Sequence, residues 1–241
     1  MARITDEGIK GTIGDVVFYT REGKKYVRSK PGKRKKKRNA PENPLNTIFG
    51  LVSTYGSGMV KSMKESFLFP LGLKSYNNAR GWMRNLYAEH KDEVNWELSV
   101  KNSGMCQLNA EVDLRDFLRT DITVNDSGSR MITVVLPEIN PKRDFKVPPR
   151  TMKVNVKLIV VTSPFRIAPY PYSFCTQQIS FIYNNDPVPA SSFELQATAG
   201  TGDIAIVAMA LEYETSDSGN GSYNKDQKWL PGAIIAMGKL K

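Results

Sequence analysis

The residues with the clearest capacity for chemistry are cations near the start of the chain. Between residues 21 and 38 there are eleven Lys or Arg and one acid, Glu22, a net charge of +10 that equals the net charge of the whole chain. Such concentrated charge predicts a polyanionic partner, such as nucleic acid, an anionic membrane surface or an acidic protein patch. The alternative is a solvated basic loop that only aids solubility. The candidate polyanion-binding residues are Arg21, Lys24, Lys25, Arg28, Lys30, Lys33, Arg34, Lys35, Lys36, Lys37 and Arg38.

Aromatic residues accompany these cations. Phe18, Tyr19 and Tyr26 lie in the same stretch, and Trp82 stands between Arg80 and Arg84. Tyr26 and Trp82 are the candidates for stacking on bases. The run from 33 to 38 could neutralise up to about six phosphates, which gives affinity without sequence reading.

Residue types that support catalysis or metal binding are sparse. The chain has one histidine, His90, and two cysteines, Cys106 and Cys175, without the C-x-x-C spacing of zinc sites. We expect both cysteines to pack as small hydrophobic residues, although a disulfide between them stays open. The glycines between Gly8 and Gly14 lack the preceding strand, the following helix and the Gly-Lys-Ser/Thr sequence that a P-loop requires, so we expect flexible backbone or tight turns there. We therefore expect neither an enzyme nor a bound metal or cofactor.

Three regions must position these residues. Residues 1–44 are predicted to form a β-hairpin, with Glu22 and Gly23 in its turn, followed by an extended basic arm from residue 32. Residues 45–92 show helical spacing in two segments, from Leu45 and from Leu73 to Tyr87, which predicts a helical hairpin. Gly56 and Gly58 interrupt the first segment, so we expect a bend or two short helices.

Residues 93–241 alternate apolar and polar side chains in many short segments separated by turn residues. This pattern predicts a mainly β chain, with an antiparallel immunoglobulin-like β-sandwich as its largest domain and a smaller α part. A division into two strand-rich halves near 164–171 stays open. The expected strands are Val94–Val100, Cys106–Val112, Asp121–Val124, Met131–Leu136, Met152–Val161, Cys175–Tyr183, Phe193–Thr198, Ile204–Tyr213 and Ile234–Met237.

The start of the chain lacks the apolar core of a secretory signal, and no stretch of about eighteen apolar residues occurs. We expect a soluble protein made in the cytoplasm, without a transmembrane segment. It could be incorporated into a virion or another particle.

The opening of the chain resembles a known family. The residues that carry the resemblance are the glycines at 11 and 14 before Asp15–Tyr19, the segment from Gly23 to Pro31, and Phe49 after an Asn-rich stretch. They resemble an uncharacterised family of Bacteroidota proteins known only as a domain of unknown function, mainly over residues 8–50. The segment from Lys101 to Gly104 resembles a mid-chain motif of that family. The resemblance implies a bacterial or phage setting and no catalytic residues.

Three hypotheses about function follow. The first is a non-enzymatic structural or assembly protein, such as a component of a phage or mobile-element particle, in which the body packs against like copies and the basic arm contacts a neighbouring subunit or nucleic acid. The second is a monomeric module that binds DNA or RNA without sequence preference. The third is a carbohydrate-binding sandwich that uses exposed aromatics in 168–172 and 223–229.

Overall fold

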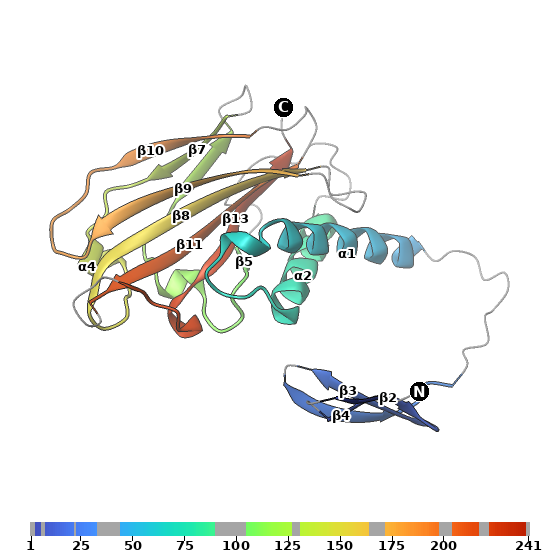
Figure 1. Ribbon diagram of the computed structural model, residues 1–241. Helices are drawn as coiled ribbons and strands as arrows, with labels where there is room; N and C mark the ends of the chain where they lie inside the picture. Colours follow the sequence, from blue (N-terminus) through green and yellow to red (C-terminus); the bar gives the residue numbers. More distant parts are fainter. Residues whose placement is uncertain are drawn as a thin grey trace. The chain divides into compact units, whose positions relative to one another are not determined.

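The computed structural model describes residues 3–5, 8–21, 23–32, 44–89, 105–126, 131–163, 172–197, 204–216 and 222–239 (Figure 1). The chain forms two compact units, Met1–Asn43 and Pro44–Lys241. Outside the described residues lie His90, the expected strand at 94–100, the segment 101–104 and the lysine-rich run at 33–38.

The N-terminal unit is a four-stranded antiparallel sheet in the order β1-β2-β3-β4. The expected hairpin is present as β3 and β4. The two strands before it were not expected, and Gly8 and Gly11 lie within β2 rather than in turns. Both have positive φ values, 108° and 114°, which glycine adopts in an irregular strand without steric cost. The strand bounds are Arg3–Thr5 for β1, Gly8–Ile13 for β2, Val16–Arg21 for β3 and Lys24–Ser29 for β4.

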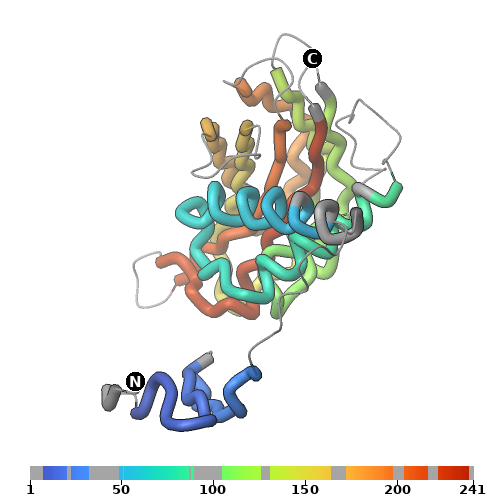
Figure 2. The backbone as a smooth tube through the Cα atoms, turned by 90° about the vertical axis from the view of Figure 1, so that its right-hand side faces the viewer, coloured from blue at the N-terminus to red at the C-terminus, as the bar shows by residue number. Residues whose placement is uncertain are grey.

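The helical part consists of α1 (Pro44–Ser62), the 3-10 turn η1 (Lys64–Ser66) and α2 (Leu73–Glu89). Of the two expected forms, two short helices are wrong, because α1 continues through Gly56 as a single helix. A Cβ atom at Gly56 would lie 3.0 Å from the backbone nitrogen of Arg80 and 3.1 Å from the carbonyl carbon of Ala79 in α2. The glycine therefore serves the close approach of two helices, which lie side by side in Figure 2.

The rest of the second unit contains two antiparallel sheets, one with six strands in the order β5-β13-β11-β8-β9, where β12 pairs with β11, and one with three strands in the order β10-β7-β6. The larger sheet comprises β5 (Cys106–Gln107), β8 (Thr151–Ser163), β9 (Ser173–Ile182), β11 (Ile204–Thr215), β12 (Ser222–Tyr223) and β13 (Gly232–Lys239). The smaller sheet comprises β6 (Thr123–Asp126), β7 (Met131–Leu136) and β10 (Ser191–Gln196). Three short turns complete the unit: η2 (Leu114–Asp116), α4 (Pro141–Asp144) and η3 (Gln227–Trp229).

The expectation of a mainly β chain is confirmed, with differences in the strands. The strand expected at Cys106–Val112 ends after Gln107. There the side-chain amide of Asn109 donates to the carbonyls of Gln227, at 2.8 Å, and Leu230, at 2.9 Å, which holds the chain against η3. The immunoglobulin-like detail stays a prediction.

Two apolar cores lie on opposite faces of the larger sheet. One fills the space between the two sheets, and the other lies between the larger sheet and the two helices. Strand β11 contributes to both cores, with Leu211 on one face and Ile206 on the other, which explains its nearly continuous apolar sequence. The helices and both sheets therefore share one unit, and the expected boundaries 45–92 and 93–241 fall inside it.

The segment 164–171 lies outside the described residues, and strands on both sides of it pair with one another. β8 pairs with β9 and β11 in the larger sheet, and β7 pairs with β10 in the smaller one.

Both cysteines are free, and burial raises the pKa of the Cys106 thiol to about 12, which makes it unreactive near neutral pH.

Candidate nucleic-acid interface

The hairpin β3–β4 places aromatic and basic side chains on one face. A two-residue connection joins the strands, with Gly23 at a φ of 75°, and this short loop fixes which residues face each other. Tyr19 lies opposite Tyr26, and Val17 lies opposite Arg28. Since opposite residues share a face and side chains alternate along a strand, Tyr19, Tyr26, Lys24 and Arg28 all lie on the same face.

The two tyrosines stack. Their ring centroids are 5.5 Å apart and their planes differ by 19°. The Arg28 guanidinium lies 5.6 Å from the centroid of the Tyr19 ring, within the range of a cation–π contact. Tyr19 is 38% exposed and Tyr26 is 40% exposed, so part of each ring remains open to solvent. We call this face, with Tyr19, Lys24, Tyr26 and Arg28, the tyrosine–arginine face.

The structure separates the sequence-predicted cations. Lys24 and Arg28 belong to the tyrosine–arginine face, and the Arg21 backbone pairs with that of Lys24. Lys25 lies on the opposite face, where its ammonium group lies near Gly8 of β2. The Lys30 backbone N–H donates to the carbonyl of Asp15 at 2.6 Å, which ties the end of the hairpin to the preceding turn. The cations from Lys33 to Arg38 lie outside the described residues.

The opposite face of the same hairpin carries three apolar side chains beside Lys25. Val16, Phe18 and Val27 lie there, and Val27 is 62% exposed. Over residues 8–20 and 23–32 of this unit, no residue is buried. A sheet without a core of its own gains little stability from apolar burial within itself.

Of the two aromatics selected from the sequence, Tyr26 belongs to the tyrosine–arginine face and Trp82 does not. Trp82 is half-buried against the helix–sheet core of the second unit. Sequence reasoning missed Tyr19 as the stacking partner of Tyr26. The two-residue loop was the signal that could have identified it, because it pairs residues at equal distances from the loop.

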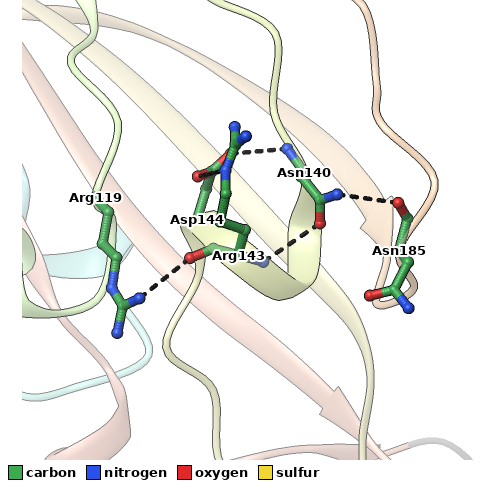
Figure 3. Close-up of polar contacts among 5 residues, drawn as sticks. All are labelled: Arg119, Asn140, Arg143, Asp144 and Asn185. Carbon is green, nitrogen blue, oxygen red and sulfur yellow. Dashed lines mark hydrogen bonds and ion pairs between the residues drawn. The ribbon is translucent and has the colours of Figure 1, made fainter.

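Polar side chains also gather at α4, where the two sheets are joined (Figure 3). The Asp144 carboxylate accepts a bidentate pair of hydrogen bonds from Arg143, at 2.8 and 2.9 Å, and one from the Asn140 backbone N–H at 2.7 Å. Asn140 in turn donates to the Asn185 carbonyl at 3.0 Å. These bonds lower the pKa of Asp144, with Arg143 as the main cause. These hydrogen bonds cap α4 and join it to the loop at Asn185, so the cluster stabilises the connection between the two sheets.

A buried polar row crosses the larger sheet beside the helices. Asn155 is fully buried, accepts from Ser180 at 2.6 Å and donates to Glu214 at 3.1 Å. Its neighbour Glu212 is 4% exposed, and its carboxylate lies 3.5 Å from the Lys157 ammonium. At that distance the contact is an ion pair without a well-formed hydrogen bond, and burial raises the pKa of Glu212.

The aromatics considered for a sugar platform are dispersed. Trp229 packs edge-on against Phe117, with ring centroids 5.8 Å apart, and is half-buried. Tyr223 is 40% exposed on β12. Of the segment 168–172 only Tyr172 is described.

Within the described ranges, no three His, Cys, Asp or Glu side chains gather as a metal site would require. None of the described helices is both long and apolar enough to cross a membrane. No family model, curated protein or solved structure matches this chain. The resemblance of residues 8–50 to a Bacteroidota family therefore stays a prediction.

Proposed function

We propose that this chain is a non-enzymatic structural or assembly protein whose N-terminal unit binds nucleic acid. The observation that carries the proposal is the tyrosine–arginine face, in which two stacked, half-exposed rings lie between Lys24 and Arg28. Bases stack on such rings whatever their identity, and the cations attract the phosphates. A single-stranded ligand suits this face best, because its bases are free to stack.

The distribution of charge supports the same proposal. The unit Met1–Asn43 contains thirteen Lys or Arg and five Asp or Glu, a net charge of +8, whereas residues 44–241 contain 21 and 19, a net charge of +2. The nucleic-acid contact therefore belongs to the small unit. This leaves the larger unit to supply contacts with other copies, as in a phage or mobile-element particle.

Binding to a fluorescent oligothymidylate, followed by anisotropy, tests the nucleic-acid contact. We expect Tyr26→Leu to weaken binding about 5- to 150-fold, since one base–aromatic stack contributes about 1–3 kcal/mol. Tyr223→Leu is the matched control, because both tyrosines are 40% exposed and Tyr223 lies in the other unit. Equal affinities of the two variants would contradict the proposed interface.

Light scattering tests the assembly part of the proposal. We expect an oligomer that persists at about molar salt, where charge contacts are screened over about 3 Å. Replacing Lys33 to Arg38 with serines should leave its mass unchanged. A monomer at all protein concentrations would contradict assembly and leave a simple nucleic-acid-binding module.

A further inference from the structure

Strand β9 is an open edge of the six-stranded sheet. It pairs with β8 along its length, from Ser173 opposite Thr162 to Ile182 opposite Lys153. No second strand pairs with β9 among the described residues, and Figure 1 shows it beyond β8 at the border of the sheet. The outer side of an edge strand presents backbone N–H and C=O groups that another strand can bind.

β9 lacks the features that keep edge strands from pairing with other chains. Its ten residues include no charge, no proline and no glycine. The other edges are protected by charge or by shortness. β1 has Arg3, β4 has three cations, β6 has Asp126, β10 has Glu194, and β5 and β12 are two residues long.

The exposed side chains of β9 are arranged symmetrically about Gln178. Along the solvent-facing side the order is Phe174, Thr176, Gln178, Ser180 and Ile182. An apolar residue stands at each end, with Phe174 59% and Ile182 66% exposed, and a hydroxyl residue stands on each side of the central amide.

This symmetry makes the strand complementary to itself when a second copy runs antiparallel to it. With Gln178 opposite its own symmetry mate, Phe174 faces Ile182 and Thr176 faces Ser180 of the other copy. A neighbouring register on either side would place Phe174 opposite Ser180 or Asn184. Apolar pairing therefore selects one register.

We propose that β9 pairs with β9 of a second copy of this chain, antiparallel about a two-fold axis at Gln178, so that the two six-stranded sheets become one. In a two-fold contact, both subunits use the same surface. The partner of β9 is therefore β9 of another copy of this chain. Because β9 has no charged residue, pairing the two strands brings no like charges of β9 together. This inference rests on the assembly part of the proposed function and names β9 as the surface through which two copies associate.

Cysteine cross-linking of the full chain tests both the contact and its register. In a Cys175→Ala background, Gln178→Cys places two thiols on residues whose Cα atoms lie about 4.5–5.5 Å apart across the axis, within reach of a disulfide. Thr176→Cys is the matched control, since its symmetry mate would lie about 14 Å away. With diamide as oxidant we expect a linked dimer from Gln178→Cys alone.

A charge at the axis provides a second measurement. We expect Gln178→Lys to shift the mass from dimer to monomer in light scattering at about 0.15 M salt, because it sets two like charges directly opposite each other. Gln196→Lys makes the same change on the exposed side of β10 and should leave the dimer intact. An unmodified chain that stays monomeric would overturn both the contact and the assembly proposal. A chain that is oligomeric, yet cross-links equally from both cysteine positions or from neither, would overturn the β9 contact alone.

Discussion

Glu212 and Glu214 lie two residues apart on β11 and share one face, yet their environments shift their pKa values in opposite directions. Burial is the main cause of the raised pKa of Glu212, and the Lys157 ammonium opposes it only partly. Glu214 is more exposed, and the hydrogen bond from Asn155 is the main cause of its lowered pKa. The two carboxyl groups should therefore contribute to stability with opposite dependence on pH.

The prediction at this scale concerns the pH dependence of unfolding. Above pH 4.5 the folded state holds the Glu212 proton more tightly than the unfolded state, so stability falls as the pH rises through the raised folded pKa. Glu212→Gln should remove this loss. Urea midpoints measured between pH 4 and pH 8 test it, with the difference between variant and parent at each pH as the readout.

Glu214→Gln is the matched comparison on the same strand. The lowered pKa of Glu214 gives stability that is present above its ordinary value of 4.5 and is lost as the pH falls through the folded value. This variant should therefore lose stability at neutral pH relative to acid. Parallel pH profiles for both variants would refute the opposed environments.

At the scale of elements, Gly56 decides how closely α1 and α2 approach. Alanine there would gain about 1 kcal/mol of helix propensity, but its Cβ would press on backbone atoms of α2 at 3.0–3.1 Å, which cannot yield unless the helix moves. We expect Gly56→Ala to lower the free energy of unfolding by up to about 2 kcal/mol net. Chemical denaturation followed by circular dichroism measures this change.

Gly50→Ala and Gly81→Ala are the controls within the same two helices. Both glycines are exposed, and a Cβ at either meets no atom within 4 Å. These variants should therefore raise the free energy of unfolding by about 0.5–1 kcal/mol. Stabilisation by all three substitutions would show that the helices do not need the glycine.

The same glycine shows why the sequence predicts some elements better than others. β7 was expected over its full length, Met131–Leu136, because its alternation reflects one buried and one less buried face. The continuity of α1 could not be predicted, since it depends on α2 packing at a distance in sequence. Likewise β11 is buried on both faces only because the helices cover the larger sheet.

The candidate interface was predictable in composition but not in geometry. The cations and Tyr26 could be selected from the sequence, whereas the packing of Trp82 against the helix–sheet core could not be predicted from it. The division of Lys25 from Lys24 and Arg28 follows from strand alternation alone. It could have been derived once the two-residue loop fixed the register.

At the scale of the whole molecule, two units of different charge share one chain. If nucleic acid contacts the N-terminal unit, the salt dependence of binding should arise from that unit, since each phosphate neutralised contributes about −0.7 to the slope of log K against log salt for a single strand. Stacking on Tyr26 should change affinity without changing this slope, because no counterion is released by it.

The prediction is that replacing Lys24, Lys25 and Arg28 together with serine makes the slope shallower by up to about 2. Replacing Lys61, Lys64 and Lys74, three exposed cations of the helical layer, should leave the slope unchanged. Anisotropy titrations of an oligothymidylate at several salt concentrations measure both triples. If both triple variants make the slope shallower by the same amount, net charge alone drives binding. If the hairpin variant keeps the slope of the unmodified chain, the phosphate contacts belong to the run from Lys33 to Arg38.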